Sequence, residues 1–298
     1  MDLLLPGLLR GVGIGSLYAL LAVSFVIIYR ATTVVNFAQP ALMILGSYFT
    51  ALFAVQLGLP FPLAVLLAMA ALAVVGAVTE RVAMRPLVGQ PVFSAAMVTV
   101  GVFIVLTMVA NRLIGPGIIV VGDPWGIEFL RVGSLTVFQS DVARTVLGLG
   151  AVGAVGLFLK RSRVGLAMRA TSLDQETALA QGVDVGRMFS LAWAISAALA
   201  GLAGMLVGTG SGGLEATAAL IALKALPVII LGGIDSIEGA VVAGLLVGVA
   251  EALTRVYQPL YAPWLGANFD VVVPYVILMA TLMVRPYGLF GTPEVERV

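Results

Sequence analysis

The chain has 298 residues, of which 61% are hydrophobic and only 10% are charged, with a formal net charge of +1 and a mean hydropathy of +1.12. This composition is typical of a polytopic helical membrane protein, because a soluble domain of this length could not bury so much apolar surface in one core. With no basic face, no cysteine and no histidine, the chain is not expected to bind nucleic acid, form disulfides, hold a metal or carry a catalytic residue.

Nine apolar segments approach the roughly 20 residues that a helix needs to cross a membrane. The predicted spans are 8–29, 37–56, 61–79, 93–113, 141–159, 189–208, a short one at 217–231, 239–256 and 270–285. The first is too long for a signal-peptide core and follows no basic region, so we interpret it as a retained helix. The chain is therefore expected to form one all-α domain over residues 1–298, a polytopic transmembrane bundle of about eight or nine spans, some of them discontinuous.

Lysine and arginine gather in alternate loops, and the side that carries them is expected to be the cytoplasm. They lie at Arg30, in the 79–92 and 160–187 loops, and near the end at Arg285 and Arg297. The 114–140 segment, expected to be an ordered surface loop with a short hairpin, then faces outward. Nine spans place the N-terminus outside, whereas eight place it inside if 217–231 only re-enters the membrane.

Small residues recur at the spacing at which transmembrane helices pack closely. The pairs are Gly11 and Gly15, Gly204 and Gly208, and Gly244 and Gly248, with a further run at Gly148, Gly150, Gly153 and Gly156. We interpret them as helix-packing surfaces.

Two apolar segments are interrupted. Residues 36–40 set two amides and Pro40 at the head of the second span, and Pro227 with residues 232–239 breaks the second half. Broken helices in both halves point to a transport pathway, because unwound backbone is tolerated in a membrane only beside protein or water. The alternative is that Pro40 begins a helix and that residues 232–239 form an ordinary loop.

A charged segment at 160–187 interrupts the apolar chain. It concentrates Lys160, Arg161, Arg163, Arg169, Asp174, Glu176, Asp184 and Arg187. A capping box is predicted, in which Ser172 accepts from the Gln175 amide and the Gln175 side chain reaches back. The helix is expected to run over 173–181 and to end at Gly182 in a left-handed cap. A short capped helix at the surface suits docking; a plain connector is the alternative.

Six short segments share a pattern across nearly the whole chain. They are Asn36-Phe37-Ala38-Gln39 followed by Gly46-Ser47-Tyr48; Arg85-Pro86-Leu87; Arg169-Ala170-Thr171 with Asp174, Ala178 and Gly182-Val183-Asp184; the small-residue run 198–204; 232–240; and 285–291. In this order they resemble the ABC-importer permeases of the branched-chain amino acid (LivH-type) family. Two positions depart from the family pattern: Asp235 stands where Gly is frequent, and Gln39 where His is common.

The resemblance implies a type II ABC-importer-like permease that works by alternating access and is not an enzyme. No Gly-x-x-x-x-Gly-Lys-Ser/Thr motif is present, so the chain is expected to bind no cofactor, and ATP is expected to be used by separate cytoplasmic ABC ATPase subunits. These subunits are implied to dock on the coupling loop at about 160–187, at Arg169, Ser172, Asp174, Gln175, Glu176, Ala178, Gly182 and Asp184. The other implied partners are a second homologous permease chain (LivM-type), an extracytoplasmic substrate-binding protein and the lipid bilayer, in the plasma (inner) membrane of a bacterium.

By the same resemblance the second helix lies near the centre of the bundle. With the second interruption, it supplies the candidate pathway residues Asn36, Gln39, Ser47, Gly232 and Gly233. Amide groups there could engage a zwitterionic or amide substrate without an unpaired buried charge, although hydrogen bonding between helices is the alternative for each. The implied substrates are branched-chain or other amino acids, with urea or short-chain amides as the alternative.

Acidic residues at membrane depth are few. Glu215 and Glu251 come nearest to it, and Glu251 is expected to pair with Arg255 one turn later. Glu80 and Arg81 are interpreted as charges at the membrane surface. An ion-coupled secondary transporter needs buried charges in its core helices, and the sequence offers almost none. A passive channel and an intramembrane enzyme are disfavoured because Asn-Pro-Ala repeats and a convincing acid pair are absent.

Overall fold

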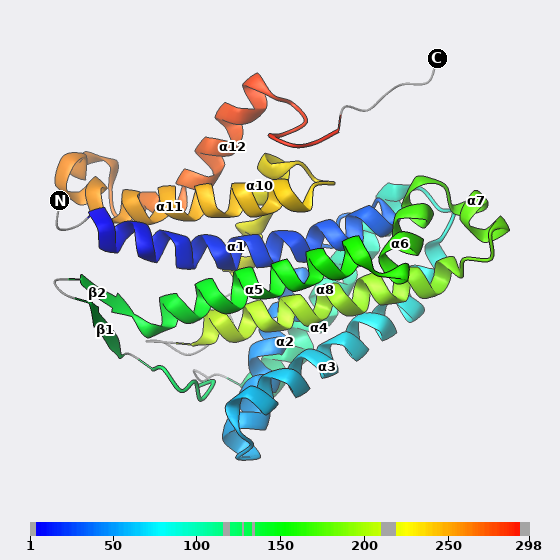
Figure 1. The fold of residues 1–298 in the computed structure, drawn as a ribbon, viewed down its shortest axis with the longest axis horizontal. Helices are drawn as coiled ribbons and strands as arrows, with labels where there is room; N and C mark the ends of the chain where they lie inside the picture. Colours follow the sequence, from blue (N-terminus) through cyan, green and yellow to red (C-terminus); the bar gives the residue numbers. More distant parts are fainter. Residues whose placement is uncertain (1–3, 116–119, 127, 133–134, 210–218, 293–298) are drawn as a thin grey trace.

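Helices dominate the structure, a computed structural model that describes residues 4–115, 120–126, 128–132, 135–209 and 219–292 (Figure 1). The helices are α1 (Leu4–Thr32), α2 (Gln39–Ala51), α3 (Phe61–Thr79), α4 (Val92–Ile114), α5 (Gln139–Arg161), α6 (Arg163–Leu173), α7 (Gln175–Ala180), α8 (Val185–Gly208), α9 (Ala219–Leu223), α10 (Ala225–Gly232), α11 (Ile237–Tyr261) and α12 (Val273–Val284). Short turns are η1 (Leu52–Gln56), η2 (Glu80–Met84), η3 (Arg85–Leu87), η5 (Pro263–Leu265) and η6 (Phe269–Val271), and two strands are β1 (Phe129–Val132) and β2 (Leu135–Phe138). The expected all-α bundle is confirmed.

Six helical stretches among the described residues are long and apolar enough to cross a membrane. They are α1, α3 with the turns after it (Phe61–Leu87), α4, α5, α8 and α11. Two shorter apolar stretches, Ile221–Gly232 and Phe269–Val284, accompany them. These helices are those of a multi-pass membrane bundle.

Proline and glycine set several helix ends. Pro40 lies in the first turn of α2, so it begins a helix and does not interrupt one. Gly115 ends α4 with φ +73°, and Gly233 ends α10 with φ +102°, both in the left-handed region that glycine tolerates. The predicted span at 217–231 is discontinuous, because its described part consists of α9 and α10 with Lys224 between them.

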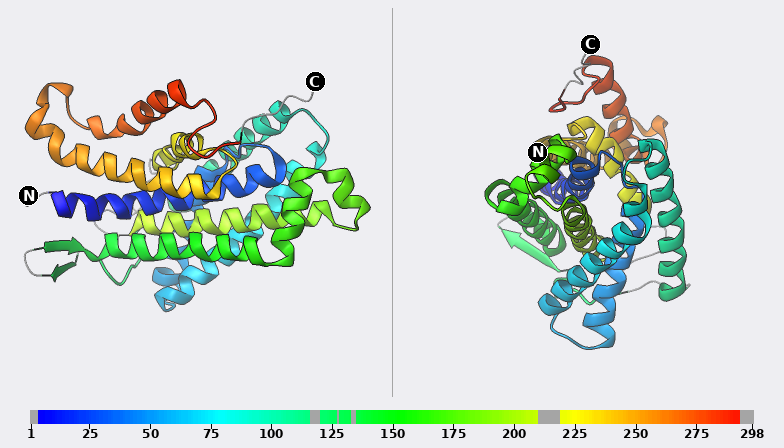
Figure 2. Two further views of the ribbon diagram at one scale, coloured as in Figure 1. Left: turned by 45° about the horizontal axis from the view of Figure 1, so that its top comes forward. Right: turned by 90° about the vertical axis from the view of Figure 1, so that its right-hand side faces the viewer.

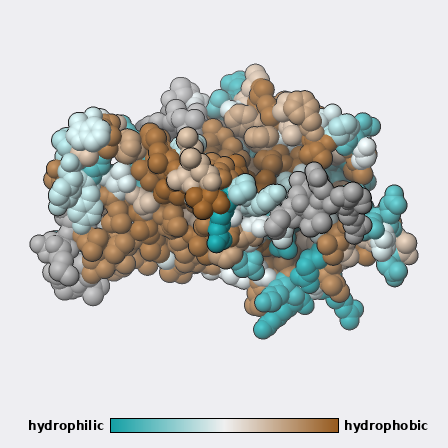
Figure 3. Space-filling model, turned by 90° about the horizontal axis from the view of Figure 1, so that it is seen from above, coloured by the Kyte–Doolittle hydropathy of each residue, from teal (hydrophilic) through white to brown (hydrophobic). Residues whose placement is uncertain are grey.

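The first helix forms the centre of the bundle. In its most apolar window, 89% of α1 is buried, against 11% for α4 and for α5. Viewed down the long axis, α1 has other helices around it, while α12 lies at the edge (Figure 2). The exposed apolar side chains of the outer helices form a broad hydrophobic surface, and hydrophilic residues gather at the α6–α7 end (Figure 3). This surface is suited to lipid or to another membrane helix.

Predicted glycine pairs bring α1 and α11 together. A Cβ added at Gly15 would lie 2.7 Å from the Cα of Leu245, and one at Gly244 would lie 2.6 Å from the backbone nitrogen of Ala19. A side chain at Gly204 of α8 would overlap the Met43 carbonyl of α2. Close backbone approach is what holds helices together in lipid, so these predicted packing surfaces are confirmed.

The glycine run on α5 behaves differently. Gly148 packs on Ser16 of α1, with its added Cβ 3.1 Å from the Ser16 carbonyl oxygen. At Gly150, Gly153 and Gly156 no described atom lies within 4 Å of an added Cβ. The prediction of a packing surface within this chain is therefore wrong for these three, because no described part of the chain packs against them.

The two ends of the bundle differ in structure. The predicted hairpin is confirmed: β1 and β2 pair antiparallel, with Phe129 opposite Phe138 and their ring centroids 4.6 Å apart. It lies at the same end of the molecule as the start of α1, whereas α6 and α7 lie at the opposite end (Figure 1).

Candidate functional site

The α6–α7 element projects from one end of the bundle. Asp174, in an extended conformation between the two helices, is the N-cap of α7: its Oδ1 accepts from the backbone N–H groups of Glu176 (2.9 Å) and Thr177 (3.1 Å). The Thr177 hydroxyl also donates to Oδ2 at 2.6 Å. These bonds, the hydroxyl first, hold the pKa of the Asp174 carboxyl below its ordinary value.

The predicted capping box at Ser172 and Gln175 is wrong. Helix α6 continues through Leu173, so the backbone at Ser172 is already inside a helix, and its hydroxyl donates to the Arg169 carbonyl at 2.8 Å. A residue can cap only where the backbone leaves helical geometry, and that occurs at Asp174. The predicted end is confirmed, since Gly182 has φ +80°.

Other residues expected in the coupling loop face in different directions. Ala178 is buried on the bundle side of α7, and Glu176 is exposed. Asp184 caps α8 by accepting from the Arg187 N–H at 3.0 Å. Arg169 turns back into the bundle, where its Nη1 donates to the Leu159 carbonyl at 2.6 Å. Only some of the predicted docking residues therefore lie on the exposed surface of the element.

Two exposed leucines were not foreseen as surface contacts. Leu173 is 87% exposed at the end of α6, and Leu179 is 58% exposed on α7. Apolar side chains that stand out from a polar surface commonly mark protein contacts. They provide apolar anchors near α7, on an element that also exposes Leu166 (62%) and Ala180 among its polar residues.

The turn after α3 is fastened to the start of α8. Arg85 donates to the Glu80 carboxylate (3.3 and 3.2 Å), to the Gly186 carbonyl (3.0 Å) and to the Ser190 hydroxyl (3.1 Å). The Ser190 hydroxyl in turn donates to Glu80. Glu80, interpreted from the sequence as a charge at the membrane surface, is only 1% exposed and so lies buried within the chain. Arg85 balances its charge.

The opposite end of α8 is fastened in a similar way. Arg144 of α5 donates to the Leu206 carbonyl (3.1 Å) and to the Thr209 carbonyl (3.2 Å) and pairs with Asp141 at 3.0 Å. Cations at a helix C-terminus satisfy carbonyls that have no partner within the helix. Arginines from two other helices therefore hold both ends of α8.

Three predicted pathway residues make buried hydrogen bonds: Gln39 and Ser47 bond to other helices, and Asn36 bonds locally to Gln39. The Gln39 amide nitrogen donates to the hydroxyls of Ser24 on α1 (2.7 Å) and Ser196 on α8 (2.6 Å), and its oxygen accepts from Asn36 at 2.9 Å. Ser47 donates to the Gly204 carbonyl. Each of these side chains is 0% exposed. The structure thus places them where helices α1, α2 and α8 meet.

The two predicted pathway glycines lie at a junction of two sequence motifs. Gly232 packs on Gly239, and Gly233 packs on Gly291 of the closing segment. The backbone N–H groups of Leu289 and Phe290 donate to the carbonyls of residues 231 and 232 at 2.8 and 3.0 Å. Side chains at these glycines would prevent this approach, so segments 232–240 and 285–291 form one unit.

A cluster of charged groups at membrane depth joins four segments. Glu251 of α11 accepts from Lys224 Nζ (2.7 Å), from the Tyr18 hydroxyl of α1 (2.7 Å) and from Arg255 (3.5 Å). Arg255 also pairs with Asp270 at 2.5 Å. The side chains of Glu251 and Asp270 are 2% and 7% exposed. Ionisable groups at this depth are rare, and paired ones are functional candidates.

Sequence patterns foresaw only the Glu251–Arg255 pair. The position of Lys224 within an apolar stretch was a signal that this lysine has a buried carboxylate as its partner. The expectation that the core holds almost no charge is wrong, because Glu80, Asp141, Glu251 and Asp270 are all buried among the described residues. Each has a cation beside it. Glu215 lies outside the described residues.

Comparison with known proteins identifies what the chain resembles. The profile of the family described as "Branched-chain amino acid transport system / permease component" matches residues 7–282. The permease protein LivH of the high-affinity branched-chain amino acid transport system of Salmonella typhimurium is 30% identical, over 99% of this chain and 97% of that protein. BraD of Pseudomonas aeruginosa, from a system of the same description, is 31% identical over 99% and 98%. A probable LivH of Methanocaldococcus jannaschii is 30% identical over 93% and 89%.

Among solved structures, a chain of "PsaBC from Streptococcus pneumoniae in complex with Fab" has a similar fold. Its TM-score is 0.51 and its sequence identity is 14%, over 96% of this chain and 93% of that chain. The likeness concerns the fold.

Proposed function

Because the chain belongs to the family of branched-chain amino acid transport permeases, we propose that it moves branched-chain amino acids across the membrane by alternating access. It is a multi-pass membrane protein and the permease subunit of an ATP-driven ABC importer, which works with ATPase and substrate-binding partners. The α6–α7 element is the proposed link between ATP hydrolysis and transport. It projects from the bundle, and the chain continues from it directly into α8.

The ATPase subunits dock on the α6–α7 element. Leu173 and Leu179 supply apolar contact, and the exposed Glu176 with the turn at Gly182 surrounds them. Asp174 keeps α7 helical, while Arg169 and Asp184 join the element to α5 and α8. Ser172 and Gln175 belong to the same surface. ATP is used by these subunits, and the chain itself binds no cofactor and carries no ATPase site.

The orientation follows from the basic end. Nine passes through the plasma (inner) membrane of a bacterium place α6 and α7 in the cytoplasm, and they place the N-terminus and the hairpin outside. The substrate-binding protein then docks at the hairpin end. The type II importer arrangement pairs this chain with a second homologous permease of the LivM type, for which the exposed apolar sides of the outer helices offer a surface.

Asn36, Gln39 and Ser47 remain the proposed borders of the pathway. A neutral hydrogen-bonded cluster between helices can exchange its bonds for bonds to water or substrate when the helices separate. Gly232 and Gly233 permit the tight junction at the end of α10, and we place the hinge of the pathway there.

Reconstituted transport tests the proposal. The full chain, co-purified with its ATPase and permease partners in proteoliposomes with the binding protein outside, is expected to take up leucine only with ATP inside. Urea is the competing substrate and is expected to be neither transported nor inhibitory. ATP-independent uptake, or uptake of urea in place of leucine, would contradict the proposal.

A surface variant tests the docking element. Leu173→Ser is expected to reduce ATPase co-purification roughly tenfold, because an anchor at an interface typically contributes 1 to 2 kcal/mol or more. Leu130→Ser in the hairpin removes an exposed leucine at the other end and is the matched control. Equal retention of the ATPase by both variants would place the docking surface elsewhere.

A further inference from the structure

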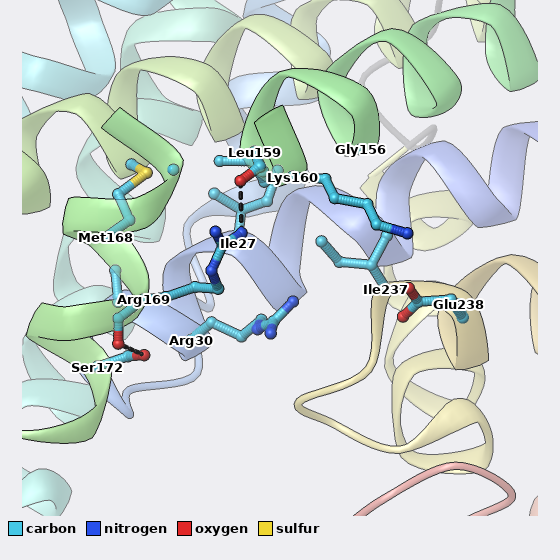
Figure 4. Close-up of a pocket in the computed structure, with 12 residues that line it drawn as sticks. Ile27, Arg30, Gly156, Leu159, Lys160, Met168, Arg169, Ser172, Ile237 and Glu238 are labelled. Carbon is cyan, nitrogen blue, oxygen red and sulfur yellow. Dashed lines mark hydrogen bonds between the residues drawn. The ribbon is translucent and has the colours of Figure 1, made fainter. Parts of the chain in front are cut away.

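A basic cavity opens at the α6 end of the bundle, separate from the exposed surface of α7. It has a volume of about 230 Å³ and lies between the ends of α1 and α5, the helix α6 and the first turn of α11 (Figure 4). Arg30, Lys160 and Arg169 line it together with Glu238. Three helices therefore direct one cation each to the same space.

The charge of the cavity favours an anion. Three basic side chains and one acidic side chain give it a net charge of +2, from 3 − 1. Neither Arg30 nor Lys160 makes a hydrogen bond or ion pair with another described residue. Arg169 uses one N–H on the Leu159 carbonyl, which fixes its guanidinium at the wall and leaves further N–H groups for a ligand. The cavity also lies at the N-terminal turn of the 25-residue helix α11, whose dipole favours negative charge.

The position of the cavity is that of a lipid headgroup. Arg30 and Lys160 lie in the last turns of the membrane-spanning helices α1 and α5, where bilayer and water meet. Gly156 lines the cavity, and Gly153 and Gly150 continue from it toward the middle of α5. At all three glycines an added Cβ meets no described atom within 4 Å, so a glycine strip about 9 Å long on α5 leads away from the cavity with open space beside it.

We propose that this cavity binds the phosphate of an anionic phospholipid in the leaflet at the α6–α7 end, with an acyl chain along the glycine strip of α5. A phosphate accepts several charge-assisted hydrogen bonds at once, which matches Arg30, Lys160 and Arg169. A lipid chain on this strip accounts for the three glycines that pack on no described part of the chain. A bound lipid would touch α1, α5, α6 and α11 together.

Native mass spectrometry of the full chain tests the site. After delipidation and exchange with nanodiscs of phosphatidylglycerol or of phosphatidylcholine, the chain is expected to retain phosphatidylglycerol selectively. Arg30→Gln and Lys160→Gln are each expected to weaken that retention about fivefold, and the double variant about thirtyfold, from roughly 1 kcal/mol per cation. Arg163→Gln at the exposed start of α6, outside the cavity, is the matched control and is expected to change nothing.

A second variant separates shape from charge. Gly156→Leu keeps every cation, suits a helix and occupies the open space where the glycine strip meets the cavity, so it is expected to lower retention of phosphatidylglycerol with the helical content unchanged. Inorganic phosphate at millimolar concentration is expected not to displace the lipid. Equal losses in Arg163→Gln and Arg30→Gln, retention unaffected by Gly156→Leu, or displacement by free phosphate would each overturn the proposal.

Discussion

Two buried polar clusters lie on the central helix, and they differ in charge. Ser24 belongs to a neutral cluster with Gln39 and Ser196, while Tyr18, six residues earlier or about 9 Å along α1, belongs to a charged one around Glu251. The neutral cluster joins α1 to α2 and α8. The charged cluster joins α1 to α11 and to Lys224 between α9 and α10.

The difference in charge indicates which contacts can open. A neutral hydrogen bond contributes about 1 kcal/mol net, because water offers the same bonds when the helices separate. A buried charge that loses its partner costs about 3–5 kcal/mol. We therefore expect α1 and α11 to move together, and α2 and α8 to separate from α1 during transport. The glycine packing of α1 on α11 favours the same division.

The largest expected effect is at Glu251. Glu251→Gln leaves Lys224 buried without a carboxylate, and it is expected to destabilise the chain by about 3–5 kcal/mol. Thermal unfolding in detergent, followed by tryptophan fluorescence, measures the loss. Lys224→Met leaves Glu251 with Arg255 and Tyr18 and is expected to cost less, and the double variant is expected to recover part of the stability. A cost below about 1 kcal/mol for Glu251→Gln would remove the distinction between the two clusters.

A smaller effect is expected at Gln39. Gln39→Leu leaves the Asn36 amide and the Ser24 and Ser196 hydroxyls short of one partner, which costs about 1–3 kcal/mol. Ser196→Ala removes one bond of Gln39 and the bond from the Ser196 hydroxyl to the Ser24 carbonyl, leaves the Gln39 bonds to Asn36 and Ser24, and is the milder companion. Uptake per correctly folded molecule is the second measurement, and Gln39→Leu is expected to reduce it more than its loss of stability explains. A Gln39→Leu variant with normal uptake would argue that this cluster does not border the pathway.

The smallest effect on stability is expected at Asp174. Its side chain is exposed, and water screens the interactions of an exposed charge. Its pKa is lower in the folded chain than in the unfolded one, so its contribution is complete above the unfolded pKa and is lost as the pH falls through the folded one. The protection factors of the Glu176 and Thr177 amides, which are exchange rates corrected for their intrinsic pH dependence, are expected to fall on acidification. Asp174→Asn, which caps without charge, is expected to abolish that pH dependence. An unchanged pH profile in the variant would assign the effect to another group.

Six of the nine predicted spans coincide with described helices long and apolar enough to cross a membrane, and the packing glycines of α1 and α11 were also predicted, because both depend on local pattern. Apolar runs of about 20 residues define the spans, and Gly11, Gly15, Gly244 and Gly248 lie where their spacing predicts. The cap of α7 was misplaced by two residues, because Ser172 and Asp174 are both good caps and only the length of α6 decides between them.

The buried charges could not be predicted in the same way. Tyr18 and Glu251 are 233 positions apart, and Lys224 and Glu251 are 27 apart, so their contact depends on how α1, α10 and α11 pack. Only the i,i+4 pair of Glu251 with Arg255 is local, and it is the longest of the three contacts of that carboxylate. The same limit applies to Gln39, whose partners come from two other helices.

The arginines at the two ends of α8 have a mechanical consequence. This helix has 24 residues and is about 36 Å long, enough to cross the hydrocarbon layer. Arg85 donates to a carbonyl in its first turn and Arg144 to carbonyls at its last turn. The ends of α8 are therefore expected to move with the turn after α3 and with the start of α5. A movement of a few ångströms at the α7 end of α8 is then transmitted along the helix to its other end, and no rearrangement of side chains in between is needed. The two ends of α8 are therefore expected to move together.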